Sequence, residues 1–328
     1  VVDATGKVLD TTVIYPTAPQ NKVEDAKKTL KKLIEKYQIS LISVGNGTAS
    51  RESEQIIAEF IKEIPEHVQY VIVNEAGASV YSASKLATEE FPKFDVGQRS
   101  AVSIARRLQD PLAELVKIDP KAIGVGQYQH DMNQKHLSEA LGNVVEDCVN
   151  KVGVDLNTAS ASLLEYISGI SKVIAKNIVA YREENGAFTN RCQLLEVAKL
   201  GPKAYEQCAG FLRLPESEMP LDRTGVHPES YAAAEGLLAL CGYGLADVAA
   251  KRVGGLAKKI KSPEKTAAEL GIGVPTLEDI MRELEKPGRD PREDAPAPVL
   301  RSDVLSMEDL QEGMVLTGTV RNVIDFGV

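Results

Sequence analysis

Apolar and polar positions alternate in a way that divides residues 1–115 into strands and helices. Apolar side chains recur at helical spacing from Val23 to Tyr37 on a lysine-rich background, which predicts an amphipathic helix. The short apolar runs Ile39–Val44 and Tyr70–Val73 predict buried strands. A turn at Asp3–Lys7 leads into a further predicted strand, Val8–Tyr15. This order of elements predicts an α/β unit with a parallel sheet.

Polar loops follow two of these strands, at the end of the sheet where α/β folds place their sites. The first is Gly45–Glu52, in which Ser50 is the predicted N-cap of a helix. The second is Asn74–Ser79. Because the first loop lacks a complete GxGxxG pattern and the chain holds no GxxxxGK[ST], a nucleotide cradle is disfavoured.

Two helix–turn–helix units follow one another between Asn157 and Leu214. The first turns at Ser168–Ser171 and the second at Lys199–Pro202. Glycine permits a positive φ and a close approach of the backbone. The helix after each turn presents free N–H groups and the positive end of its dipole, which suits a phosphate. The alternative is a plain pair of helical hairpins whose glycines are C-caps.

Charge is distributed unevenly along the chain. The formal net charge is −9 and the pI about 5.2, yet residues 168–214 carry seven basic and four acidic side chains, a local charge of +3. Nucleic-acid binding is therefore expected on a patch rather than over the whole surface. The predicted contact residues are Gly169, Ile170, Ser171, Lys172, Lys176, Gly201 and Lys203.

The remaining composition excludes several classes of protein. No run of eighteen apolar residues exists, so no membrane contact is expected. The four cysteines form no CxxC and predict reduced, mostly buried thiols of a cytoplasmic protein. The four histidines do not form a metal-binding set, and no cofactor is predicted.

The last third of the chain combines helices with an extended tail. Residues 216–286 are predicted helical, and Lys258 and Lys259 belong to a basic cluster that is either a second nucleic-acid surface or a solvated helix face. Residues 287–301 form a proline-rich linker. Phe326, in an apparent barrel strand near the end, is placed either to stack on a base or to pack in a core.

Several motifs occur in the same order as in a known family. They are GNGTASRE at 45–52, NEAGAS at 74–79, RSAVSIARRLQDP at 99–111, GVGQYQHD at 124–131, LDRTGVHPESY at 221–231, and residues 155–214. On these motifs the chain resembles the Tex family, bacterial transcription accessory proteins related to the eukaryotic elongation factor Spt-six.

The resemblance implies a multidomain α/β plus all-α fold. It also implies that an N-terminal region and most of the last domain lie outside this sequence. The strand patterns at both ends, which read as cut, likewise lead us to expect a longer protein. The expected domains are a YqgF-type RNase H-like domain (1–118, first strand missing), a connecting helical segment (119–153), a tandem helix-hairpin-helix domain (154–215), a second helical, helix-hairpin-helix-like domain (216–286), the linker (287–301) and the start of an OB-fold barrel (302–328).

Catalysis is a separate question raised by the RNase H-like resemblance. Active relatives of that fold hold two divalent metals on carboxylates at strand ends. Glu75 matches the second acidic position, and Asp110 is a candidate for a third, with a helix-ending Asp-Pro turn as the alternative. The first acidic residue would precede Val1, so no enzyme is predicted in this form, and Mg²⁺ is expected only if that site is active.

The sequence thus predicts a transcription accessory scaffold that binds the backbone of RNA, DNA or both without reading bases. One alternative is a metal-dependent nuclease. The other is a protein-docking scaffold on RNA polymerase or the ribosome.

Overall fold

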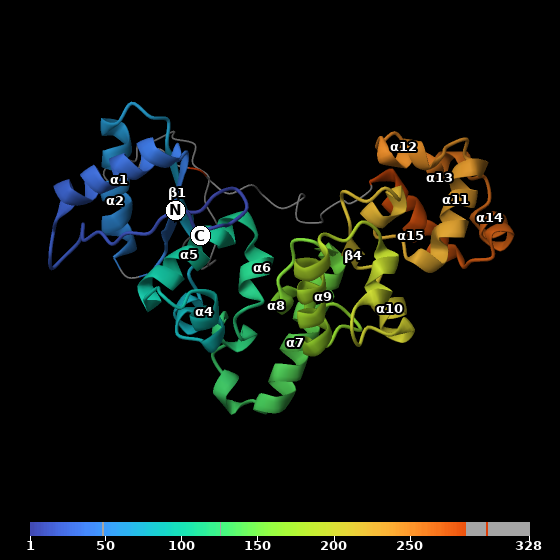
Figure 1. The fold of residues 1–328 in the computed structure, drawn as a ribbon, viewed down its shortest axis with the longest axis horizontal. Helices are drawn as coiled ribbons and strands as arrows, with labels where there is room; N and C mark the ends of the chain where they lie inside the picture. The colour runs from blue at the N-terminus through green and yellow to red at the C-terminus, as the bar shows by residue number, and fades with distance from the viewer. Residues whose placement is uncertain (48, 125, 287–299, 301–328) are drawn as a thin grey trace, which may run out of the picture. The chain divides into compact units, whose positions relative to one another are not determined.

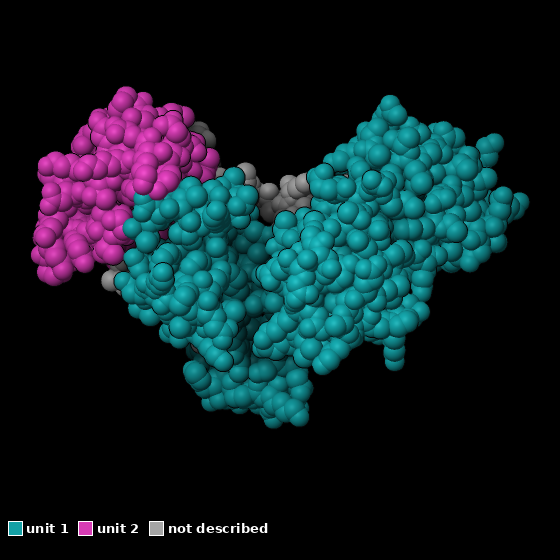
Figure 2. Space-filling model, viewed as in Figure 1, with its two compact units in different colours: residues 1–11, 75–297 teal, residues 12–74, 298–328 magenta. Residues whose placement is uncertain are grey.

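Figure 1 shows the fold in a computed structural model, which describes the chain except for residues 48, 125, 287–299 and 301–328. The chain divides into two compact units, residues 1–11 with 75–297 and residues 12–74 with 298–328 (Figure 2). The predicted linker and the predicted barrel start with Phe326 lie outside the described residues, apart from Leu300. The domain boundaries given above stay a prediction.

Residues 12–74 form a small α/β unit. Its elements are α1 (Val23–Tyr37), β1 (Leu41–Gly45), α2 (Ser50–Glu63) and β2 (Gln69–Val73). The two strands pair in parallel, in register from Leu41 opposite Gln69 to Gly45 opposite Val73. A parallel pair needs a crossover, which α2 provides. Ile34, Phe60 and Tyr70 are buried in its core, as the apolar spacing predicts.

Two details near the start of the chain differ from the sequence prediction. The Asp3–Lys7 turn forms, but among the described residues Val8–Tyr15 contributes only an isolated antiparallel bridge, Val2 to Val8. A strand needs a partner ladder, and here Val13 and Tyr15 are half exposed, so their alternation buries nothing. Helix α2 begins at Ser50 itself, one residue earlier than an N-cap serine would allow, with Ala49 as the N-cap.

Four helices follow β2. They are α3 (Ala78–Ser82), α4 (Lys85–Glu90), α5 (Val96–Gln109) and α6 (Pro111–Leu115). Polar caps fix their ends: Ser84 caps α4, and Asp95 forms a capping box with Gln98 at the start of α5. Short 3₁₀ turns η1 (Pro120–Ala122) and η2 (Gln129–Asp131) come before the long helix α7 (Gln134–Val152).

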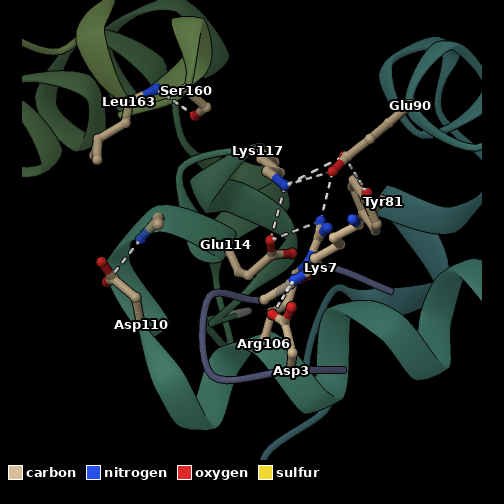
Figure 3. Close-up of polar contacts among 12 residues, drawn as sticks. Asp3, Lys7, Tyr81, Glu90, Arg106, Asp110, Glu114, Lys117, Ser160 and Leu163 are labelled. Atoms are coloured by element: carbon tan, nitrogen blue, oxygen red, sulfur yellow. Dashed lines mark hydrogen bonds and ion pairs between the residues drawn. The ribbon is translucent and has the colours of Figure 1, made fainter. Parts of the chain in front are cut away.

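A cluster of charged side chains ties these helices together (Figure 3). Glu90 accepts hydrogen bonds from Tyr81 Oη at 2.6 Å and Arg106 Nη1 at 2.5 Å, and Lys117 Nζ bridges Glu90 and Glu114. Burial alone would raise the pKa of Glu90, but Lys117, the Tyr81 hydroxyl and Arg106 together lower it. Glu90 is therefore ionised and structural.

A cavity of about 470 Å³ opens beside this cluster, between the Asp3–Lys7 turn, α5, α6 and residues 152–163. Its walls carry Glu90, Glu114, Arg106 and Lys117. These four side chains are already paired with one another, so we assign the cavity no ligand.

The next part of the chain contains the two predicted hairpins. Its elements are β3 (Val154–Asp155), α8 (Ala161–Leu164), α9 (Lys172–Asn185), the 3₁₀ turn η3 (Arg191–Glu196), α10 (Pro202–Cys208) and β4 (Leu212–Arg213). Strands β3 and β4 pair in parallel, Val154 opposite Leu212, which joins the two ends of this region. Leu156, Leu164, Ile178 and Leu194 form its wholly buried core.

Residues 219–285 form a second helical body with its own core, as predicted. Its elements are η4 (Pro220–Arg223), η5 (Pro228–Ser230), α11 (Tyr231–Leu240), α12 (Leu245–Ala249), α13 (Leu256–Lys259), α14 (Pro263–Leu270) and α15 (Val274–Glu285). Leu237, Leu256, Leu277 and Leu284 are fully buried between these helices.

The cysteines and the membrane prediction can also be checked. All four thiols are free, but only Cys208 and Cys241 are buried, while Cys148 and Cys192 are exposed, so the expectation of mostly buried thiols is half right. Burial raises the pKa of the Cys208 thiol to about 12. Throughout the described ranges, each helix is too short or too polar to span a bilayer.

Candidate nucleic-acid interface

The first hairpin lies between α8 and α9. Gly169 takes the left-handed conformation with φ +81°, and Ile170 N–H closes the turn on the Ile167 carbonyl at 3.0 Å. Ile170 is buried with its N–H engaged, so its place is in the packing of the turn. Ser171 then caps α9 by accepting the Ile174 N–H. Lys172 is the first residue of the helix and is exposed.

The second hairpin has a similar turn, but the residue with the positive φ lies two positions before the expected glycine. Lys199, not Gly201, takes the positive φ, at +68°, and Leu200 N–H closes the turn on the Val197 carbonyl at 3.1 Å. Gly201 is the N-cap of α10 with an ordinary φ of −83°. The prediction that glycine supplies the positive φ is thus correct for Gly169 and wrong for Gly201. Lys199 therefore adopts a φ that residues with a Cβ rarely take, at a cost of about 1–2 kcal/mol.

The two hairpins interlock. A Cβ atom built at Gly169 would lie 2.7 Å from Gln207 Cβ and 3.2 Å from the Ala204 carbonyl oxygen, both on α10. In the other direction, Asn177 of α9 donates a hydrogen bond of 2.6 Å to the Ala198 carbonyl in the second turn. Each turn is therefore fixed by the helix that follows the other turn.

This arrangement presents two helix starts with exposed basic side chains. Lys172 and Lys176 are one helical turn apart on α9, and both are exposed, as is Lys203 in the first turn of α10. At α9 the Ser171 hydroxyl accepts the Ile174 N–H, so the N–H groups of the first two helical residues, Lys172 and Val173, are left for a ligand. At α10, Pro202 has no N–H to offer, so Lys203 supplies the first amide donor.

Residues 219–285 hold two further hairpins, in the region that the sequence predicts as helix-hairpin-helix-like without identifying its turns. Gly242-Tyr243-Gly244 joins α11 to α12, and Gly271-Ile272-Gly273 joins α14 to α15. In each, the first glycine has a positive φ (+75° and +70°) and the second is an extended N-cap. The signal was present in the sequence as glycine, an apolar residue and glycine, twice.

The basic cluster lies close to the first of these additional hairpins. Lys259 donates to the Cys241 carbonyl at 2.8 Å and lies over the Tyr243 ring at 3.8 Å, so it stabilises the hairpin itself. Lys258 is exposed beside it on α13. The hairpin at Gly271 is flanked instead by exposed acidic side chains, Glu269 and Glu278, which disfavour a phosphate there.

The two candidate catalytic carboxylates have structural surroundings. Asp110 caps α6 by accepting the Ala113 N–H at 3.1 Å, which is the Asp-Pro turn that the sequence offered as an alternative (Figure 3). Glu75 lies near the buried Arg107: burial lowers the pKa of that guanidinium, and Glu114 and Glu75 oppose the shift. Within the described ranges, no three His, Cys, Asp or Glu side chains come together as a metal site.

Comparison with known families covers most of the chain. Residues 1–109 match the Tex protein YqgF-like domain, residues 149–213 match the helix-hairpin-helix motif, and residues 219–292 match a further domain described as an HHH domain. The third match agrees with the two additional hairpins in residues 219–285.

Curated relatives match along the whole chain. The protein YdcI of Bacillus subtilis is 57% identical over 327 residues, covering 100% of this chain and 45% of the relative. The transcriptional accessory protein Tex of Neisseria gonorrhoeae is 52% identical over 328 residues, covering 100% and 42%. The human S1 RNA-binding domain-containing protein 1 is 40% identical over 386 aligned positions, covering 100% and 38%.

The chain thus spans less than half the length of these relatives. Its three matched domains follow one another in the order that the motifs predict. The domain order, together with identities above one half to bacterial Tex proteins, shows that the chain belongs to the Tex family.

Proposed function

We propose that this chain is a nucleic-acid-binding scaffold of the transcription accessory type, and that its tandem hairpins hold the phosphate backbone. The observation that carries the proposal is the interlocked pair of hairpins, which presents Lys172, Lys176 and Lys203 at the starts of α9 and α10. Amide donors, a helix dipole and a lysine converge at each start, and all three favour a phosphate.

This chemistry does not distinguish between base sequences. Phosphate contacts position a protein on nucleic acid, whereas base contacts specify a sequence. The proposed contacts are backbone amides and lysines, so affinity should depend on salt and vary little with sequence. RNA and DNA both offer the required phosphates.

The names of the relatives support this role. One relative is called a transcriptional accessory protein, and the human relative is called an S1 RNA-binding domain protein. Because the chain spans less than half of either, docking on RNA polymerase or the ribosome is a proposal for the longer protein. We propose a cytoplasmic location, which the free cysteines and a role in transcription favour.

Fluorescence anisotropy with labelled single- and double-stranded oligonucleotides tests the proposal. Each ligand would be made in two unrelated sequences. We expect the chain to bind both sequences within a few-fold, and the Lys172→Glu/Lys203→Glu variant to bind at least about tenfold more weakly, since each lost phosphate contact is worth on the order of 1 kcal/mol.

A charge-matched control distinguishes the loss of contacts at the hairpins from an effect of the lower net charge. Lys85→Glu/Lys135→Glu reverses two exposed lysines outside the hairpins, and either double variant lowers the formal net charge from −9 by four, to −13. Equal loss in both variants would show a non-specific charge effect and refute the assignment to the hairpins.

The nuclease alternative has its own test. Glu75 acts electrostatically on Arg107, which gives this carboxylate a structural partner in place of a metal. Incubating the protein with labelled RNA and DNA and Mg²⁺ should leave both substrates intact. Mg²⁺-dependent cleavage that disappears in Glu75→Gln would establish the nuclease and overturn the scaffold proposal.

A further inference from the structure

A single arginine joins the two helix-hairpin-helix domains. Arg191 begins η3, within the tandem hairpins, and its side chain is buried, with 1% of the residue exposed. The guanidinium donates to the Leu212 carbonyl at 2.7 Å in β4, and to the Thr224 and Val226 carbonyls, the latter at 2.7 Å, in the connection to the next domain. It also donates to Tyr231 Oη at 2.9 Å, on the first residue of α11.

Asp222 completes the network from the second domain. Its carboxylate accepts the Arg191 backbone N–H at 3.0 Å, the Ser217 hydroxyl at 3.0 Å and the Tyr231 hydroxyl at 2.6 Å. Its carbonyl accepts the Leu214 N–H at 2.9 Å. A hydrogen-bonded chain thus runs from the guanidinium through Tyr231 to a buried carboxylate, so the charge of Arg191 is balanced inside the protein.

The connecting segment, residues 224–227 between η4 and η5, is held on both sides. Towards the second domain, Gly225 N–H donates to a Glu283 carboxylate oxygen of α15 at 2.7 Å, and a Cβ at Gly225 would lie 2.8 Å from that carboxylate. Towards the tandem hairpins, His227 Nε2 bonds the Glu206 carbonyl of α10 at 2.8 Å. Nδ1 of the same ring accepts the Glu229 N–H, so one neutral tautomer satisfies both contacts.

We propose that Arg191 is the positioning residue that holds the tandem hairpins and the helical body of residues 219–285 as one rigid body, so that the tandem hairpins and the Gly242 hairpin beside Lys258 contact the same strand of nucleic acid. This inference rests on the proposed function for its binding consequence only. Two modules held at a fixed spacing convert the second contact into an intramolecular event, which raises the affinity for a ligand long enough to reach both.

The chemistry of this junction requires arginine. A planar guanidinium with five donors can bond several diverging carbonyls at once, whereas lysine offers a point charge with three rotating donors. The four acceptors come from β4, from both sides of Gly225 and from α11. Removing the guanidinium therefore loosens the attachment of the connection to the tandem hairpins, which then depends on the His227 and Asp222 contacts, without removing an apolar side chain from either core.

The first test measures the spacing of the domains directly. Spin labels are attached at two exposed positions, Glu184→Cys on α9 and Glu278→Cys on α15. Pulsed electron paramagnetic resonance then reports the distance between the domains. The exposed Cys148 and Cys192 are replaced by serine. We expect one narrow distance distribution in the parent protein and a broad one in Arg191→Met.

Two further variants make this test specific. Tyr231→Phe removes one hydroxyl from the network and keeps the ring, so it should fold and broaden the distribution to a smaller extent. Arg182→Met is the matched control: Arg182 bonds the Leu156 carbonyl inside the tandem hairpins, so its loss should leave the distribution narrow. An unchanged distribution in both Arg191→Met and Tyr231→Phe would overturn the proposal.

The second test measures affinity against ligand length. A single strand of about 6 nucleotides is short enough for one module to cover, whereas one of about 24 exceeds the roughly 4–16 nucleotides that a single-strand module of the OB type occupies. Arg191→Met should bind the long strand about tenfold or more weakly than the parent protein and bind the short strand equally well. The loss is a part of the roughly 10²–10⁴-fold gain in affinity that two linked modules can give. Equal losses at both lengths would show a merely structural residue and overturn the positioning role.

The two tests separate the two proposals. If the parent protein binds neither strand, the proposed function fails, and the distance distributions alone decide whether Arg191 fixes the domains. If the distributions broaden but the long strand binds equally well in parent and variant, the rigid junction stands and its role in binding is refuted.

Discussion

Gly169→Ala should unfold the tandem hairpins locally, because two independent penalties fall on one position. Gly169 has a φ of +81°, which an L-residue adopts only at a cost of about 1–2 kcal/mol. The new Cβ would also lie 2.7 Å from Gln207 Cβ and 3.2 Å from the Ala204 carbonyl oxygen. Relieving such contacts in a packed region costs about 1–3 kcal/mol.

The backbone and steric penalties of Gly169→Ala add up to about 2–5 kcal/mol. Alanine variants of two other glycines separate the two penalties. Gly186 has a φ of +88° and a ψ of −179°, a backbone region that is essentially restricted to glycine, but no atom within 4 Å of a built Cβ, so Gly186→Ala should show a backbone penalty alone, about 1–3 kcal/mol. Gly201 has an ordinary φ and equally open surroundings, so Gly201→Ala should change stability by no more than about 0.5 kcal/mol.

Hydrogen exchange followed by mass spectrometry is the suitable assay, since a multidomain chain does not unfold in one step. Peptides from residues 154–214 report local opening, and each 1.4 kcal/mol lost speeds their exchange about tenfold. We expect acceleration of about 30-fold or more for Gly169→Ala, about tenfold for Gly186→Ala and little for Gly201→Ala.

The ranking of the three variants is the decisive result. If Gly201→Ala accelerated exchange as much as Gly169→Ala, Gly201 rather than Lys199 would carry the left-handed turn in the second hairpin. The backbone assignment of that hairpin, and with it the position of the α10 start, would then be wrong.

Two further predictions concern strain and pH. Lys199→Gly should stabilise the same peptides by about 0.5–1 kcal/mol, because the cost of a left-handed lysine that it removes, about 1–2 kcal/mol, exceeds the destabilising backbone entropy that glycine adds to the unfolded chain; slower exchange is the expected result, and faster exchange would contradict it. Glu90→Gln should cost about 2 kcal/mol at pH 7, as hydrogen bonds to a charged, partly screened carboxylate are lost. Since the folded pKa of Glu90 is lowered, this difference should be complete above the ordinary pKa of 4.5 and shrink as pH falls through the folded value. Hydrogen exchange of peptides from residues 78–117 at pH 7, 5 and 4, corrected for the intrinsic exchange rate at each pH, would measure it, and a constant difference would refute the ionic role of Glu90.

Local patterns in the sequence predicted most of the elements. The helix Val23–Tyr37 is found with those bounds, and the two short apolar runs pair as parallel strands. The hairpin at Gly169 was visible because one glycine, a buried isoleucine and a capping serine stand together. Each of these signals depends on residues close together in the chain.

The misses depend on contacts that no local pattern contains. Residues Val8–Tyr15 alternate like a strand, but a strand exists only where a partner ladder lies beside it. The positive φ of Lys199 could not be expected, because lysine gives no local reason for a left-handed backbone and the interlocked packing of the two hairpins imposes it.

The junction at Arg191 was equally hidden. In the sequence Arg191 counts only as one of the seven basic residues of the hairpin region, and nothing in the local pattern distinguishes it from the others. In the structure it is buried and bonded to carbonyls twenty or more positions away, so it contributes nothing to the exposed charge. Only the fold separates this structural arginine from the exposed lysines of the interface.

The slope of affinity against salt tests the central claim most directly. We would measure the dissociation constant for single- and double-stranded ligands across a salt series, for the parent chain and for Lys172→Glu/Lys203→Glu. Loss of two phosphate contacts should reduce the slope of log K against log salt by about 1.4 on single strands and about 1.8 on duplex DNA. The same slope in both proteins would contradict the account, because the hairpin lysines would then not contact phosphate.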